Sequence, residues 1–299
     1  SMPTAVPETR FGPRKPPWLK VRLPLPSQSE PLLKTVRRYG LETVCREARC
    51  PNAMDCHARG TATFMILGAI CTRACRFCAV TSGRPEPVDP LEPARLALAV
   101  RELDLKHCVI TSVDRDDLPD FGAGHFAACI RAVRRQCPET AIEVLTPDFQ
   151  GDPNSIATVV EAAPDVYNHN LETVPRLAPR IRPKAKYEQS LELLARVKRL
   201  DPAMTTKSGI MVGLGERDDE VRAVMADMRR HDIDILTIGQ YLRPSPKHAA
   251  VERYVHPREF AAWSRHGREL GFRHAFCGPL VRSSFHAGEV YEQAAAAPA

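Results

Sequence analysis

The sequence has no apolar stretch long enough to cross a membrane. Its longest apolar segments, such as residues 64–70, are much shorter than the ~20 residues that a spanning helix needs. Prolines occupy the N-terminal positions where a secretory signal would need an apolar core. We therefore expect a cytoplasmic protein with no membrane partner.

Aromatic residues are also scarce, at 6% of the chain, and the net charge of +6 is small for 299 residues. Basic residues cluster at 34–38, 180–186 and 196–199, but no aromatic side chains interleave with them. No nucleic-acid-binding motif accompanies these clusters, so nucleic acid is not expected as a partner. An acidic protein surface fits them better.

From residue 61 onward, apolar runs typical of strands alternate with amphipathic segments typical of helices. Six βα units in succession require parallel strands and right-handed crossovers. This predicts an α/β fold, a partial (β/α)6 barrel similar to a TIM barrel, with a doubly wound open sheet as the competitor. The predicted strands are 61–68, 107–113, 141–147, 166–173, 205–214 and 235–241, and the predicted helices are 91–103, 125–136, 153–163, 187–200 and 218–231.

Three regions are expected along the chain. Residues 1–60 would form an extended proline-rich arm, a helix at 31–44 and a cysteine-rich loop, because seven prolines before residue 30 oppose regular structure. Residues 61–271 would form the barrel and a further helix at 257–271. Residues 272–299 would form a closing segment with a disordered tail at 294–299.

Polar residues follow almost every predicted strand, at the end that reaches a ligand in such folds. Any one of them is most simply a turn residue, but each of the five strands after the first supplies at least one. A binding site at this mouth of the barrel is therefore expected. The residues are Thr111, Ser112, Asp114, Glu143, Thr146, Asn168, Asn170, Glu172, Lys207, Gln240 and Arg243.

Six of the ten cysteines lie within 34 positions. Cys71, Cys75 and Cys78 form a CxxxCxxC run directly after the first predicted strand, and three soft thiolates in a compact loop suit an iron–sulfur cluster with one open iron. A redox CxxC pair or a zinc site is the alternative. The first has no use for Cys71, and the second lacks a fourth ligand nearby.

A second triad precedes the barrel, with Cys45, Cys50 and Cys56 at CxxxxCxxxxxC spacing. A second iron–sulfur cluster is favoured. A zinc site that also uses His57 is less suitable, because His57 adjoins Cys56. The remaining cysteines are expected to be small buried side chains, and they are Cys108, Cys129, Cys137 and Cys277.

The CxxxCxxC run, with Phe77 before its last cysteine, resembles the radical S-adenosylmethionine superfamily. Residues 209–216 resemble the glycine-containing late strand of that superfamily. The resemblance implies that Cys71, Cys75 and Cys78 hold a [4Fe–4S] cluster at which S-adenosylmethionine is cleaved to a 5′-deoxyadenosyl radical. Residues expected to contact S-adenosylmethionine are Ser112, Asn170, Glu172, Lys207 and Arg243, while His169 is either a substrate contact or a structural residue.

Both cysteine triads together resemble the lipoyl synthase family over residues 31–290. Four further segments carry the likeness: 48–52 (ARCPN), 111–118 (TSVDRDDL), 168–173 (NHNLET) and 278–285 (GPLVRSSF). The family usually has tyrosine where this chain has Phe285. The resemblance implies a second, auxiliary [4Fe–4S] cluster held by Cys45, Cys50, Cys56 and Ser283, with the adjacent Ser284 as the alternative ligand.

The same resemblance implies insertion of two sulfur atoms, at C6 and C8 of an octanoyl group bound to a lysine of a lipoyl carrier domain. The auxiliary cluster would donate the sulfur, which gives its ligand Ser283 a catalytic role. An electron donor and iron–sulfur assembly proteins would be further partners. A methylthiolating enzyme and an electron-transfer or scaffold protein are the competing functions.

Overall fold

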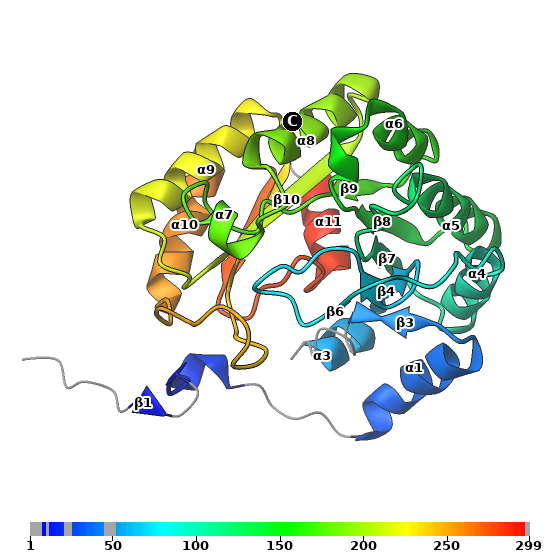
Figure 1. The fold of residues 1–299 in the computed structure, drawn as a ribbon, viewed down its shortest axis with the longest axis horizontal. Helices are drawn as coiled ribbons and strands as arrows, with labels where there is room; N and C mark the ends of the chain where they lie inside the picture. The colour runs from blue at the N-terminus through cyan, green and yellow to red at the C-terminus, as the bar shows by residue number, and fades with distance from the viewer. Residues whose placement is uncertain (1–7, 10–11, 21–25, 45–51, 297–299) are drawn as a thin grey trace, which may run out of the picture.

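The computed structural model describes residues 8–9, 12–20, 26–44 and 52–296, and an open eight-stranded sheet forms its centre (Figure 1). All neighbouring strands are parallel except the edge pair β3 and β4. From one edge to the other the strands are β12 (His274–Gly278), β11 (Ile235–Gln240), β10 (Thr205–Val212), β9 (Val166–Asn168), β8 (Ala141–Leu145), β7 (His107–Ser112), β4 (Thr61–Ile66) and β3 (Glu42–Thr43).

Helices cover the outer side of the curved sheet, each after the strand it follows in the chain (Figure 1). Their apolar stripes are buried against the strands; on α9, for example, Val221, Val224 and Met228 are fully buried. This arrangement confirms the predicted α/β partial barrel and excludes the doubly wound sheet, which would carry helices on both faces. The helices are α4 (Glu92–Glu102), α5 (Ala123–Gln136), α6 (Pro153–Glu161), α8 (Tyr187–Leu200), α9 (Asp218–Arg230) and α10 (Pro257–Glu269), with a short α7 (Ala178–Ile181) before α8.

The C-terminal region contains two elements that the sequence did not predict. β12 adds a seventh parallel strand, in register with β11 from His274 opposite Ile235 onward. The helix α11 (Ala287–Ala296) includes residues 294–296, which were expected to belong to a disordered tail. The rest of that predicted tail, 297–299, lies outside the described residues.

Helix α11 lies within the curve of the sheet (Figure 1). The backbone of Gly288 packs against Thr61 and His107, and the ring of Tyr291 lies 5.9 Å from that of His107. Val290 packs against Ile235 near the other edge of the sheet. The helix therefore contacts strands near both edges of the open sheet, and it occupies the interior between them.

The N-terminal region departs from its predicted form. A short antiparallel pair, β1 (Glu8–Thr9) and β2 (Gly12–Pro13), precedes a 3-10 turn at Pro17–Leu19. Helix α1 (Pro26–Arg38) begins and ends earlier than the predicted 31–44. Pro26 stands at its first position, where proline is tolerated, and Pro31 lies inside the helix. Gly40 takes a left-handed φ of +59° just after the helix and marks its end. No helix in the described ranges is long and apolar enough to span a membrane.

Inside the barrel, Lys207 of β10 forms an ion pair with Glu143 of β8. Lys207 Nζ lies 3.2 Å from Glu143 Oε2, and both side chains are 1% exposed. His107 Nε2 lies 3.4 Å from the other oxygen of Glu143. Lys207 is the third residue of an eight-residue strand, so it lies below the mouth of the barrel. Its charge is thus already paired in the interior, which does not favour a contact with S-adenosylmethionine; that contact stays a prediction.

Replacing one partner of this pair should destabilise the fold more than replacing both. Lys207→Met leaves the Glu143 carboxylate buried without its cation, and we expect the free energy of unfolding to fall by about 3–5 kcal/mol. The double change Lys207→Met with Glu143→Leu should recover most of this loss. The matched control is Arg38→Met, which breaks an exposed pair with Glu102 and should cost at most about 1 kcal/mol in the same denaturant titration. Equal losses for Lys207→Met and Arg38→Met would contradict the prediction.

Candidate active site

A cavity of about 270 Å³ lies at the carboxyl ends of the strands. Its walls come from the loops after β4, β7, β8 and β9, which parallel strands bring to one edge of the sheet. The three cysteines of the CxxxCxxC run line this cavity, and so do six of the predicted strand-end residues. The six are Thr111, Ser112, Asp114, Thr146, Asn170 and Glu172, and three of them, Ser112, Asn170 and Glu172, were expected to contact S-adenosylmethionine.

The three cysteines belong to a loop that begins at β5 (Ile70–Cys71) and ends at β6 (Thr81–Ser82). Cys71 Sγ accepts hydrogen bonds from the backbone N–H of Arg73 at 3.4 Å and of Asp114 at 3.3 Å. Burial raises the pKa of Cys75 to about 12 and that of Cys78 to about 11. Both thiols therefore keep their protons until a metal displaces them.

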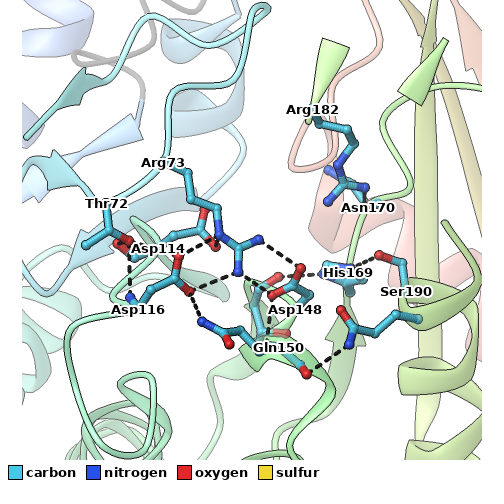
Figure 2. Close-up of polar contacts among 12 residues, drawn as sticks. Thr72, Arg73, Asp114, Asp116, Asp148, Gln150, His169, Asn170, Arg182 and Ser190 are labelled. Atoms are coloured by element: carbon cyan, nitrogen blue, oxygen red, sulfur yellow. Dashed lines mark hydrogen bonds and ion pairs between the residues drawn. The ribbon is translucent and has the colours of Figure 1, made fainter. Parts of the chain in front are cut away.

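Arg73, between the first two cysteines, fixes this loop to the barrel. Its guanidinium is 6% exposed and donates two hydrogen bonds to Asp116, at 2.8 and 2.9 Å, and two to Asp148, both at 2.8 Å (Figure 2). Burial would raise the pKa of both carboxyl groups, but the hydrogen bonds from Arg73 hold each pKa below its usual value. The loop is thereby joined to the ends of β7 and β8 by paired, charge-assisted bonds.

Arg182, after α7, supplies a second buried cation in the cavity wall. Its Nη1 donates to the carbonyl oxygens of Asn170 at 2.9 Å and Leu171 at 2.8 Å, while its Nε has no hydrogen-bond partner among the residues described. Glu172, nearby in the same wall, has its pKa raised by burial. A cation with a spare donor thus lies in the same cavity as a carboxyl group.

The sequence did not identify Arg73 or Arg182 as site residues. One feature of the sequence could have identified Arg73. It lies inside the CxxxCxxC run, and the acidic segment 114–117, which could pair with it, follows the next predicted strand. Arg182 fell within a cluster of basic residues that is typical of a solvated surface. Both side chains are in fact buried, and each is held by residues from another part of the chain.

His169 is held in place by the protein on both sides of its ring. Nδ1 donates to the carbonyl of Thr146 at 2.8 Å, and Nε2 lies 2.8 Å from Ser190 Oγ (Figure 2). Burial lowers the pKa of His169 to about 4, so the ring is neutral at pH 7. Of the two roles predicted for His169, these contacts favour the structural one.

Because His169 is held neutral, the free energy of unfolding should decrease as the pH is lowered. The pKa of His169 drops from about 6.5 in the unfolded chain to about 4 in the folded chain, so the unfolded state binds the proton first as pH decreases. Its contribution is present above pH 6.5 and is lost as pH falls toward 4. We expect the free energy of unfolding to fall by about 1 kcal/mol from this residue between pH 7.5 and 5.5. Denaturant titrations of His169→Gln should show a flatter pH dependence, and an unchanged slope would contradict the prediction.

Ser283 lies in the segment 279–286 between β12 and α11, where Asn170 Nδ2 donates a hydrogen bond to Ser283 Oγ. Asn52, just before α3 (Ala53–Ala58), donates to the carbonyl of Leu280 at 2.6 Å. Cys56 Sγ on α3 lies 3.8 Å from the carbonyl oxygen of Ser284. Cys56 and this segment are therefore neighbours. The other two predicted ligands of the second cluster, Cys45 and Cys50, lie outside the described residues.

The path of this segment depends on a glycine and on an aromatic stack. A Cβ at Gly239 of β11 would lie 1.9 Å from the carbonyl oxygen of Val281, so only glycine permits this close approach without a shift of the backbone. Phe285, at the position where the family usually has tyrosine, stacks on Phe276 at 6.0 Å. Together these contacts hold the backbone on both sides of Ser283.

Arg243 does not line the cavity, so its contact with S-adenosylmethionine also stays a prediction. Its Nε donates to the carbonyl of His248 at 2.9 Å, and it braces the loop between β11 and α10. His248 Nε2 in turn lies 2.8 Å from the carbonyl oxygen of Cys78. Arg243 therefore supports the loop that packs behind the cysteine triad. The cysteines predicted to be core residues are buried at Cys108, Cys129 and Cys137 and partly buried at Cys277.

The cysteine triad fits a [4Fe–4S] cluster better than a single metal ion. Within the part of the chain that the structure describes, no three Asp, Glu, His or Cys side chains converge on one point as ligands of a single ion must. In a [4Fe–4S] cluster each thiolate binds a different iron, so such convergence is not needed. Three soft thiols, none in a disulfide, line one cavity and meet the requirement for the cluster's donors.

Comparison with known proteins agrees with this geometry. Residues 65–228 match the family described as the radical SAM superfamily. The chain is 56% identical over 280 residues to lipoyl synthase of Rubrobacter xylanophilus, covering 94% of this chain and 87% of that protein. It is 57% identical over 274 residues to lipoyl synthase of Caldanaerobacter subterraneus subsp. tengcongensis (92% and 96% covered), and 54% identical over 290 residues to that of Azotobacter vinelandii (96% and 89% covered).

Solved structures with a similar fold are much more distant in sequence. Methylornithine synthase (PylB) superimposes with a TM-score of 0.55 at 12% identity, covering 69% of this chain and 62% of its own. HydG, a maturase of the [FeFe]-hydrogenase, gives a TM-score of 0.56 at 13% identity, covering 70% of this chain and 49% of its own. At these identities the likeness concerns the fold alone.

Proposed function

The chain belongs to the lipoyl synthase family, and we propose that the cavity at the carboxyl ends of its strands is where it carries out that family's reaction. The enzyme is a radical S-adenosylmethionine sulfurtransferase that inserts sulfur at C6 and C8 of an octanoyl group on a carrier protein. One structural observation supports this location above others. The three cysteines of the CxxxCxxC run and six strand-end polar residues line the same cavity.

We assign Cys71, Cys75 and Cys78 to the cluster that works with S-adenosylmethionine. A reduced [4Fe–4S] cluster with S-adenosylmethionine supplies a 5′-deoxyadenosyl radical when both are bound. The role of this chain is to keep the cysteine loop fixed against the barrel. Arg73 does so through its buried pairs with Asp116 and Asp148.

The same cavity offers groups that suit the amino acid end of S-adenosylmethionine, which carries one carboxylate and one ammonium group. Arg182, with its spare Nε donor, suits the carboxylate, and Glu172 suits the ammonium group or a ribose hydroxyl. Ser112 and Asn170 lie in the same wall and add hydrogen-bonding capacity. Arg182 thus takes the cationic role for which the sequence suggested Lys207 and Arg243.

Replacing Cys71, Cys75 and Cys78 together by Ala should abolish release of 5′-deoxyadenosine from S-adenosylmethionine. The iron content should fall from about eight to about four per chain, because only one of two [4Fe–4S] clusters loses its ligands. The matched control is Cys137→Ala, which removes a buried thiol at the end of α5 and should keep both readouts. Continued cleavage of S-adenosylmethionine in the triple variant would refute the assignment.

We further propose that Ser283 is the fourth ligand of the auxiliary cluster, with Cys45, Cys50 and Cys56 as the others. The contact between Cys56 and the carbonyl of Ser284 supports a site at this place, since it puts α3 beside the segment that carries Ser283. A serine oxygen is a harder donor than a thiolate and a poorer match for cluster iron. A ligand of this kind suits a cluster that must give up its sulfur. Because Asn170 bonds to Ser283 Oγ and also lines the cavity, one side chain connects the two sites.

Ser283→Cys should retain the auxiliary cluster but lose roughly 100-fold in lipoyl product per 5′-deoxyadenosine released, because a thiolate holds the iron more firmly. Ser283→Ala should also impair sulfur insertion, since it removes the ligand. Both variants should still cleave S-adenosylmethionine.

Ser284→Ala and Ser284→Cys are the matched controls. It is the backbone carbonyl of Ser284 that approaches Cys56, so changes to its side chain should leave product formation near the wild-type level. Full turnover by both Ser283 variants would mean that this residue serves only the turn.

The partners follow from this chemistry. The substrate is an octanoylated carrier protein, and we propose that its docking face is acidic, since the enzyme has a net charge of +6. An electron donor and iron–sulfur assembly proteins are the further partners that two such clusters require. A cytoplasmic location, where thiols are kept reduced, suits a protein that uses so many cysteines as ligands. We also propose the division into an N-terminal region of residues 1–60, a barrel of 61–271 and a C-terminal segment of 272–299.

A further inference from the structure

Four exposed cationic side chains lie on three loops around the cavity. These are the cysteine loop between β5 and β6, the α7–α8 loop and the β11–α10 loop. Each cationic residue is adjacent in the chain to a residue that lines or anchors the cavity. One precedes Phe77, two flank Ala185, and the last precedes His248, which contacts the carbonyl of Cys78. We call this set the cationic rim, and it comprises Arg76, Lys184, Lys186 and Lys247.

Backbone hydrogen bonds tie the three loops of the rim together. The N–H of Arg76 donates to the carbonyl of Ile181 at 2.9 Å, and the N–H of Ala249 donates to the carbonyl of Arg76 at 2.8 Å. The cysteine loop therefore lies between the other two loops. The side chain of Arg76 takes no part in these bonds.

Among the described residues the rim charges have no partner, in contrast to other exposed cations near them. Arg176 pairs with Glu220 at 2.7 Å, and Arg253 pairs with Glu259 at 2.9 Å. The side chains of the four rim residues make no ion pair or hydrogen bond with any residue in 8–9, 12–20, 26–44 or 52–296. Within two residues of any rim member, the only exposed carboxylate is Glu188. The sequence next to the rim residues therefore carries an excess of positive charge.

We propose that the cationic rim is the docking surface for an acidic face of the octanoylated carrier domain, an inference that rests on the proposed function. The octanoyl group is carried on a lysine arm of a folded protein. A cavity of about 270 Å³ is far too small for a protein domain, so the carrier must rest on the mouth. Unpaired charges at the edge of an interface steer the partner and orient it as it associates. The rim thus selects the protein, and the cavity receives its acyl chain.

The test uses a variant with all four rim residues changed to Gln. The side-chain change at Arg76 leaves its backbone bonds to Ile181 and Ala249 in place. The matched control removes the same charge from four exposed arginines on the outer helices α5 and α10, which likewise have no ion pair among the residues described. The rim changes are Arg76→Gln, Lys184→Gln, Lys186→Gln and Lys247→Gln, and the control changes are Arg131→Gln, Arg135→Gln, Arg265→Gln and Arg268→Gln.

Two probes separate docking from chemistry: an octanoylated lipoyl carrier domain with a negatively charged surface, and a short octanoyl-lysine peptide of zero net charge. Equilibrium binding of the carrier is measured apart from turnover, on the cluster-loaded enzyme. We expect the rim variant to bind the carrier about 10-fold more weakly at low salt, and the difference to shrink as salt screens the charges. Its turnover of the peptide should stay within about twofold of wild type, and the control should match wild type for both probes.

Three results would overturn the docking surface. They are equal weakening by the rim and control variants, unchanged carrier binding by the rim variant, and a loss of single-stranded oligonucleotide binding in place of carrier binding. Failure of the wild-type enzyme to convert either probe, with rim-dependent carrier binding intact, would instead count against the proposed function. Binding and turnover thus report on the two proposals separately.

Discussion

The guanidinium of Arg73, held between the carboxylates of Asp116 and Asp148, is the interaction on which the site depends. The cysteine loop has little regular structure of its own, with only the short strands β5 and β6 at its ends. A buried arginine that makes two hydrogen bonds to each of two carboxylates fixes both its position and its orientation. Desolvation of these charges is costly, and only such complete pairing offsets it. The loop is thus held against the ends of β7 and β8 by side-chain bonds in place of secondary structure.

Much of the fold could be predicted because the parallel strands are apolar runs that alternate with amphipathic helices. β12 escaped prediction because it is five residues long and begins with His274, so no apolar run marks it. Its pairing with β11 depends on tertiary contacts that a local pattern does not record. The alanine-rich end of α11 similarly gives no amphipathic signal, yet the interior of the barrel holds that helix.

The predicted site was most accurate where spacing along the chain carries the chemistry, as in the CxxxCxxC run. The sequence did not resolve how far along its strand a residue lies. Lys207 and Asn170 were both expected at the mouth of the barrel, but Lys207 lies at the third position of β10, whereas Asn170 follows the end of β9. Arg73 and Arg182 were missed because the groups that bury them come from other loops, with Asp148 75 residues from Arg73. Only the folded chain brings such partners together.

The bridging position of α11 has a consequence for the order in which the enzyme is made. A chain emerges from its N-terminus first, so the strands of the barrel exist before residues 279–296 do. The last segment then enters a sheet that is still open between its two edges, and only at that moment does Ser283 reach Asn170. The contact between Ser283 and Asn170 therefore forms only after all the strands of the barrel have been made. A chain that stopped before residue 279 would contain Cys71, Cys75 and Cys78 on their anchored loop but would lack Ser283.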